Sequence, residues 1–342
     1  MRVGPWLLSA LLLMAATAGH CQGLSDPAKA KGRGWVDISE KVIQGLSREG
    51  KKIAWPGKTA GVAVDRTTGD VFMIVPDQGI WKSSDRGASF SRVDRGQVGG
   101  RCETGFSLNF DPRGKRLACF MLDGPSGYTL DGGATWEGLK GNGRGWDSGS
   151  VDWSADKPAH IFALRHESGG EIYISDDMGK SWQLQGKGFA SVGILAANLL
   201  VATKEKERGI FRSSDAGRNW EKVSDLQPAG RDIRIFNGSA YWTTSEGLLL
   251  SKDKGKTWTV QGTAVECSYG PYFGQDERHI VVVGKKGFFE TSDGGRQWNL
   301  VAPLPPEFSS PLPGWFLNFG WDPNANVFYA SRMGMPTYKY QR

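Results

Sequence analysis

Three arginines of the chain follow a glycine in glycine-rich stretches: Arg101 (GGRCETG), Arg144 (GNGRGWD) and Arg231 (PAGRD). A guanidinium is planar and donates parallel pairs of hydrogen bonds, so it binds carboxylate, sulfate or phosphate groups bidentately. If the fold gathers these arginines, they would hold an anionic ligand. The alternative is that each arginine pairs with an acid close to it in sequence, these acids being Glu103, Asp147 and Asp232.

Carboxyl groups and aromatic rings in the same stretches indicate a second chemistry. Glycoside hydrolysis needs two carboxyl groups about 5 to 9.5 Å apart across the scissile bond. The candidates are Glu103, Asp147, Asp232 and Glu266. The rings that would stack on a sugar are Trp146, Tyr269, Tyr272 and Trp315. A neighbouring polar stretch adds Arg165, His166 and Glu167.

A repeat defines the elements that must position these residues. The pattern Ser/Thr-x-Asp-x-Gly-x-x-aromatic occurs six times, with its aspartates at Asp85, Asp131, Asp177, Asp215, Asp253 and Asp293. Successive aspartates are 38 to 46 residues apart, and a period near 40 residues with internal turn signals is typical of propeller blades. The first unit has four strand patterns, at 60–65, 70–75, 79–84 and 89–93. Because short turns separate them, each unit is predicted to be a four-stranded antiparallel blade.

The repeated motif itself is predicted to be a structural turn. Its aspartate can accept backbone N–H groups within the turn, its glycine can adopt a positive φ, and its hydroxyl can fix the start of the turn. The aromatic residue can bury its ring against a neighbouring sheet. We therefore expect the six aspartates to build blades and to take no part in catalysis.

The motif resembles the Asp-box, or BNR, repeat of the sialidase-like propellers, and the resemblance extends over nearly the whole chain after residue 18. Such propellers include sialidases, xyloglucan-cleaving hydrolases and photosystem II assembly factors, and the organisation here is most similar to the assembly factors. A sialidase would use an arginine cluster on the substrate carboxylate. The Arg-Ile-Pro motif of sialidases is absent from this sequence.

The ends of the repeat array predict an all-β, seven-bladed propeller. After the sixth motif, three strand patterns remain, at 315–322, 326–331 and 336–340. Near the N-terminus, GRGWVDIS (32–39) parallels GRNWEKVS (217–224), so Trp35 occupies the place of a motif aromatic. This N-terminal strand is expected to complete the last blade and to remove a free sheet edge. A six-bladed ring with residues 299–342 as a tail is the alternative.

The order of strands also predicts which face binds a ligand. The Asp boxes join the third and fourth strands of each blade, whereas the long connections between blades emerge on the opposite face. The three Gly-Arg pairs stand just before the first strand of a blade, and first strands line the axis. We therefore expect Arg101, Arg144 and Arg231 at the mouth of the channel, on the face opposite the boxes.

The remaining features bound the chain as a whole. A short positive start, an apolar run at 6–16 and the small residues at 16–18 predict a signal peptide (1–18), so residues 19–342 form the single predicted domain, which is periplasmic or extracellular. The net charge of +6 is too small and too dispersed to indicate nucleic-acid binding. The four histidines show no metal-ligand spacing, and there is no P-loop or dinucleotide motif. We expect a monomer that needs neither a metal nor a cofactor.

These observations favour a non-catalytic binding or assembly propeller. Its partner would be an anionic glycan or a protein segment, held on the face opposite the Asp boxes. The alternative function is a glycoside hydrolase that uses the carboxylates of that face.

Overall fold

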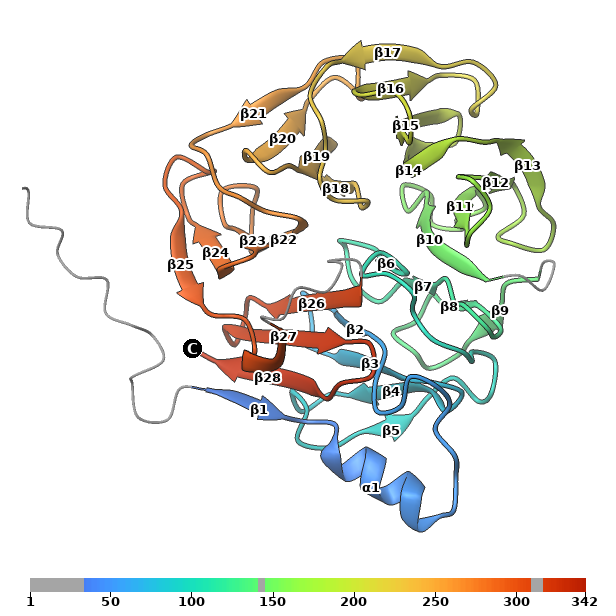
Figure 1. The fold of residues 1–342 in the computed structure, drawn as a ribbon, viewed down its shortest axis with the longest axis vertical. Helices are drawn as coiled ribbons and strands as arrows, with labels where there is room; N and C mark the ends of the chain where they lie inside the picture. The colour runs from blue at the N-terminus through green and yellow to red at the C-terminus, as the bar shows by residue number, and fades with distance from the viewer. Residues whose placement is uncertain (1–33, 141–144, 309–315) are drawn as a thin grey trace, which may run out of the picture.

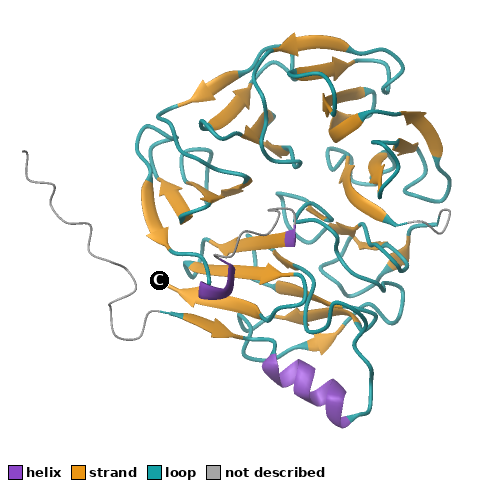
Figure 2. Cartoon of the chain, viewed as in Figure 1, coloured by secondary structure: helices purple, strands orange, loops and turns teal. Residues whose placement is uncertain are grey.

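The computed structural model describes residues 34–140, 145–308 and 316–342, which form a ring of seven four-stranded antiparallel sheets (Figure 1). Each sheet is one blade, and its first strand faces the axis of the ring. Strands and the loops between them make up nearly all of this part of the chain (Figure 2). The prediction of seven blades is confirmed, and the six-bladed alternative is wrong.

Six of the blades follow one another directly along the chain. Blades 1 and 2 contain β2 (Val62–Val64), β3 (Val71–Val75), β4 (Gly79–Ser83) and β5 (Ser91–Arg92), then β6 (Leu108–Phe110), β7 (Leu117–Cys119), β8 (Gly127–Thr129) and β9 (Glu137–Gly138). Blades 3 and 4 contain β10 (Trp146–Val151), β11 (Ile161–Arg165), β12 (Ile172–Ser175) and β13 (Gln183–Gly186), then β14 (Phe189–Ala196), β15 (Leu199–Lys204), β16 (Ile210–Ser213) and β17 (Glu221–Ser224). Blades 5 and 6 contain β18 (Arg234–Phe236), β19 (Ser239–Thr243), β20 (Leu248–Ser251) and β21 (Thr259–Gln261), then β22 (Tyr269–Phe273), β23 (Ile280–Gly284), β24 (Gly287–Thr291) and β25 (Asn299–Ala302).

Blade 7 closes the ring with strands from both ends of the described chain. It contains β26 (Leu317–Asp322), β27 (Val327–Arg332) and β28 (Thr337–Gln341), and its outer strand is β1 (Trp35–Asp37). Trp35 pairs with Tyr340 in the antiparallel register, and the two rings pack 5.4 Å apart. The Trp35 indole also donates to the Pro303 carbonyl at 3.0 Å. The predicted closure through the N-terminal strand is therefore confirmed.

A short helix follows β1 and was not predicted from the sequence. Helix α1 (Glu40–Arg48) buries Val42 and Leu46 against Met73 and Val75 of β3. It lies along the rim of blade 1 (Figure 1). The segment that closes blade 7 therefore also covers apolar side chains of the next blade.

Apolar side chains fill the spaces between blades. In blade 5, Trp242 has no exposed surface and packs with Trp258, and the two rings belong to one buried cluster with Val201 and Ile210 of blade 4. The described cysteines, Cys102, Cys119 and Cys267, are buried and unpaired. Within the described ranges, no helix is long and apolar enough to span a bilayer.

The six Asp boxes share one hydrogen-bond network. In the fourth box, the Ser213 hydroxyl donates to Asp215 at 2.7 Å and accepts the Gly217 amide at 2.8 Å, while Asp215 accepts the Asn219 amide at 2.9 Å. Gly217 has a φ of 84°, where a side chain would be strained. Equivalent bonds from the hydroxyl to the aspartate and from the glycine amide to the hydroxyl occur in the other five boxes. Each box is thus a self-contained turn on one face of the ring.

These networks predict loss of stability in acid. Hydrogen bonds from the residue four positions on lower the pKa of Asp177, Asp215 and Asp253 to about 2. A carboxyl group whose pKa is lower in the folded state stabilises the fold above its unfolded pKa, about 3.9, and loses that contribution as the pH falls through the folded pKa. We expect the urea midpoint to fall as the pH is lowered from about 4 to 2. The Asp215→Asn variant should show a smaller fall, and an unchanged midpoint in the wild type would contradict the prediction.

Candidate functional site

A polar cavity of about 430 Å³ opens on the face opposite the Asp boxes, among the connections of blades 2 to 5. We call it the loop-face pocket. The charged and titratable residues that line it are Glu103, Asp147, Arg165, His166, Glu167, Glu205 and Arg231. It therefore brings together three of the predicted site residues, Glu103, Asp147 and Arg231, with the histidine of the neighbouring turn.

Asp147 is presented to the pocket by a β-bulge. The pairing of β10 with β11 shifts between Trp146 and Ser148, so Asp147 is the extra residue. Its carbonyl accepts hydrogen bonds from the hydroxyls of Thr104 and Ser107, which belong to the connection into blade 2. Bulges are often found beside active sites because they redirect a side chain. Here the bulge and two hydroxyls fix the backbone that carries the carboxylate.

An imidazole and a guanidinium face the two oxygens of the Asp147 carboxylate. His166 Nδ1 lies 2.7 Å from one oxygen, and Arg231 Nη1 lies 3.8 Å from the other. The side chains of Asp147, His166 and Arg231 are 15%, 27% and 32% exposed, so all three remain accessible to a ligand. The carboxylate is therefore oriented by neighbours and still open on one side.

Glu103 is held by an arginine from its own connection. Arg101 Nη2 lies 3.3 Å from Glu103, and a second nitrogen of Arg101 pairs with Asp123. The Arg101 side chain is 12% exposed, so most of its surface is already in contact with protein. The predicted pairing with a nearby acid is seen for Arg101, and the anion-binding role of this residue remains a prediction.

The other predicted carboxylates lie away from the pocket. Asp232 is buried, its pKa is raised by burial, and it pairs with Arg234 at 2.5 Å. Glu266 is 44% exposed and pairs with Lys285 at 3.0 Å. Neither residue lines the loop-face pocket. Of the four candidate carboxylates, Glu103 and Asp147 line this pocket.

The predicted sugar-stacking rings do not present open faces. Trp146 is 6% exposed because it packs against Trp182 and Tyr173 of the same blade. Tyr269 is 7% exposed and stacks on Phe106. Tyr272 is partly buried against the same core cluster. The remaining predicted residues, Arg144 and Trp315, lie outside the described residues.

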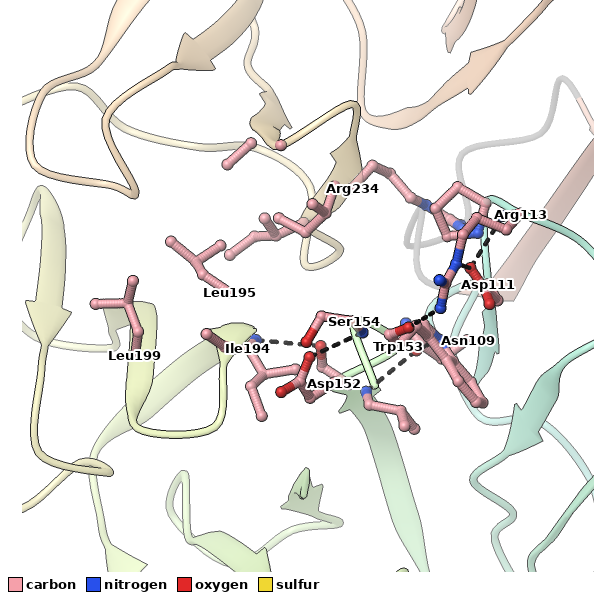
Figure 3. Close-up of a pocket in the computed structure, with 18 of the residues that line it drawn as sticks. Asn109, Asp111, Arg113, Asp152, Trp153, Ser154, Ile194, Leu195, Leu199 and Arg234 are labelled. Carbon is pink, nitrogen blue, oxygen red and sulfur yellow. Dashed lines mark hydrogen bonds and ion pairs between the residues drawn. The ribbon is translucent and has the colours of Figure 1, made fainter. Parts of the chain in front are cut away.

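A second cavity, of about 420 Å³, lies among the turns that join the first and second strands of blades 2 to 5, on the same face as the Asp boxes. Figure 3 shows it in close-up. We call it the box-face pocket, and the sequence did not predict it. Ile194, Leu195 and Leu199 form one wall, and Asp111 and Arg113 lie on the opposite side (Figure 3). The polar groups of this pocket bind one another: Arg113 pairs with Asp111 and donates to the Trp153 carbonyl, while Asn109 accepts from the Trp153 indole at 2.8 Å. The two bonds that involve Trp153 connect blades 2 and 3.

Arg66 reaches from blade 1 to residues of three other blades. It follows β2 in blade 1, yet its guanidinium donates to the carbonyls of Pro112 in blade 2 and of Phe273 and Gly274 in blade 6. Its Cζ also lies 5.1 Å from the Phe236 ring of blade 5. Burial lowers the pKa of Arg66. One side chain thus joins four blades.

Sequence reasoning named His166 but missed the two hydroxyls and the bulge that fix Asp147. The sequence gives no sign that these hydroxyls bind the Asp147 carbonyl, because Thr104 and Ser107 lie about 40 residues before it in the chain. The bulge depends on the register of two strands, which is not a property of either strand alone.

Comparison with known protein families identifies the repeated motif. Residues 173–184, which contain the third motif, match the family model described as BNR/Asp-box repeat. The chain carries the Asp-box repeat.

Longer matches to this Asp-box propeller are distant. A xyloglucanase of Hypocrea jecorina is 29% identical over 157 residues, which are 41% of this chain and 17% of that enzyme. Xyloglucanase Xgh74A of Acetivibrio thermocellus is 23% identical over 264 residues, 66% of this chain and 29% of that enzyme. The chain therefore spans less than a third of either enzyme. The structure of YCF48 from Cyanidioschyzon merolae is similar with a TM-score of 0.47 and 13% identity, covering 85% of this chain and 98% of that one.

The loop-face pocket of this Asp-box propeller is lined by groups that can form hydrogen bonds with a polar ligand. Four carboxylates (Glu103, Asp147, Glu167 and Glu205) and two guanidiniums (Arg165 and Arg231) line it. Hydroxyl groups of a ligand can donate to the carboxylates and accept from the guanidiniums. No cluster of three or more His, Cys, Asp and Glu side chains in the described ranges is placed to hold a metal ion.

Proposed function

We propose that this Asp-box propeller binds a glycan in the loop-face pocket. The observation that carries the proposal is Asp147, a carboxylate presented on a bulge, fixed through its carbonyl and flanked by His166 and Arg231. A fixed polar group that is still partly exposed suits a ligand with many hydroxyls. The distant likeness to two xyloglucanases supports a glycan over a protein segment.

The charge of the pocket narrows the kind of glycan. The carboxylates outnumber the guanidiniums by four to two, so a ligand with many negative charges would be repelled. A single carboxylate fits near Arg231, with neutral hydroxyls around Asp147. The proposed ligand is therefore a largely neutral glycan that carries an acidic sugar. Export, which residues 1–18 predict, is part of this proposal, and N-terminal sequencing of the mature protein tests it.

Replacement of Arg231 should weaken this binding selectively. We expect Arg231→Gln to reduce affinity for an acidic glycan by about 1.5 to 3 kcal/mol, the usual value of a hydrogen bond to a charged group. Affinity of the wild type should also fall as salt is added, because ions screen the attraction. Isothermal titration calorimetry with a xylo-oligosaccharide that carries glucuronic acid measures both the loss of affinity in the variant and the salt dependence of the wild type.

The matched control is Arg218→Gln, because Arg218 is an exposed arginine in an Asp box on the opposite face. It should bind as the wild type does. Equal affinity of the Arg231→Gln and wild-type proteins, with both folded, would contradict the role of Arg231.

A second function, glycoside hydrolysis, is favoured by one observation: Glu103 and Asp147 line the same pocket. If the protein is a hydrolase, it should release reducing sugars from a xyloglucan or glucuronoxylan oligosaccharide, and Glu103→Gln and Asp147→Asn should each abolish the release. Binding without release by the wild type would exclude hydrolysis of these glycans and leave the binding function.

A further inference from the structure

Trp55 presents an aromatic ring to solvent on the face that holds the loop-face pocket. The residue is 67% exposed, and among the described residues no other large apolar residue is as exposed. The tryptophans of the Asp boxes, by contrast, are buried or half-buried. The exposed indole leaves a large, flat apolar face available to a ligand.

The ring is held in place on one side and open on the other. The guanidinium of Arg101 lies over it, with Cζ 4.6 Å from the ring centroid, which is a cation–π geometry. The loop is fixed before the ring by a bond from the Ala54 amide to the Pro76 carbonyl, and after it by bonds between Thr59 and Met335. A ring that is already oriented loses little conformational entropy when a ligand stacks on it.

Trp55 is connected to the pocket through a short chain of contacts. Arg101, which lies over Trp55, also pairs with Glu103, and Glu103 lines the loop-face pocket. The ring therefore stands beside the pocket, one side chain away from its lining. A ligand that fills the pocket and continues past Glu103 would reach it.

We propose that Trp55 is a stacking subsite for a second sugar ring of the glycan held in the loop-face pocket, an inference that rests on the proposed function. A pyranose ring has an apolar face of C–H groups and a rim of hydroxyls, and an indole matches the apolar face. The surroundings of Trp55 favour a sugar over an apolar protein segment, because Arg101 and the 63% exposed Asp123 side chain are charged. Those groups can bind the hydroxyls of the rim.

The subsite predicts a dependence on ligand length. Wild-type protein should bind a xylopentaose that carries one glucuronic acid about 10-fold more tightly than it binds free glucuronic acid, which fills the pocket alone. Trp55→Ala should lose that gain and leave the affinity for glucuronic acid unchanged. Trp55→Phe, which keeps a ring, should recover part of the gain. Leu184→Ala, a change at another exposed apolar residue, is the control.

The outcomes separate this inference from the proposed function. If Arg231→Gln loses both sugars while Trp55→Ala binds the oligosaccharide as the wild type does, the subsite is rejected and the pocket stands. If the wild type binds both sugars with equal affinity, the subsite is rejected as well. If it binds neither sugar, both proposals fall, and an apolar side chain of a protein partner becomes the expected occupant of Trp55.

Discussion

Protein that lacks residues 34–48 should melt at least about 10 °C below the full chain, because several buried apolar side chains are lost and each contributes about 1.5 to 3 kcal/mol. The segment supplies β1, the outer strand of blade 7, and α1, which packs on blade 1. Ile38, Val42 and Leu46 are buried in it. Its removal also exposes the edge of β28, which would promote aggregation. Thermal denaturation followed by circular dichroism measures the effect.

Point variants of β1 locate the effect. Trp35→Ala should lower the free energy of unfolding by about 3 kcal/mol, near the lower end for loss of a packed tryptophan, since the ring is only partly buried. Val36→Ala, on the same strand but 55% exposed, should change it by less than about 0.5 kcal/mol. Equal effects of the two changes, or an unchanged melting temperature after the deletion, would show that β1 does not hold blade 7.

The second large effect is expected at Arg116. Its guanidinium pairs with Asp111, whose side chain is 1% exposed, and donates to the carbonyls of Trp153 at 2.6 Å and Ala155 at 2.7 Å. Arg116→Ala removes the buried partner of a buried carboxylate and two bonds between blades 2 and 3. Loss of one partner of a buried ion pair costs about 3 to 5 kcal/mol. Urea denaturation at neutral pH would show the loss.

Arg113 supplies a matched control, because it contacts the same carboxylate at 3.4 Å from a side chain that is 55% exposed. Exposed ion pairs contribute about 0 to 1 kcal/mol, and Arg113 donates to one carbonyl of blade 3 where Arg116 donates to two, so Arg113→Ala should have the smaller effect. If the two variants lose similar free energies of unfolding, then burial does not determine how much an arginine bound to Asp111 stabilises the fold.

The blades were predictable from the sequence because their signals are local. The bonds of an Asp box connect residues within four positions of one another. The short sequence motif is therefore sufficient to predict the turn. The match of Trp35 to a box aromatic extended this reasoning to the strand that closes the ring. Helix α1 was missed because its nine residues have few apolar positions, and their partners, Met73 and Val75, lie in another blade.

The site was predicted only in part because its contacts are not local. The sequence placed Asp147, Glu103 and Arg231 on one face, and the pocket gathers them. It did not predict that Asp123 would pair with Arg101, or that Trp182 would cover the ring of Trp146. The side chain of a residue at the inner end of a blade can either be exposed in the channel or pack against protein. The neighbouring strands determine which of the two occurs, and the sequence around the residue does not reveal it. The exposure of Trp55 is likewise set by the elements around its loop.

The pairing of β1 with β28 also imposes an order on assembly. Trp35 is synthesised long before its partner Tyr340, because the two residues lie far apart along the chain. Blades 1 to 6 each consist of consecutive strands, so they can form as the chain emerges, but blade 7 cannot be completed until β28 is available. Contacts between residues so far apart in sequence form slowly, because the entropy of closing the loop is lost before the contact stabilises it. Until then β1 lacks its partner strand, so blade 7 is the last of the seven blades that can be completed.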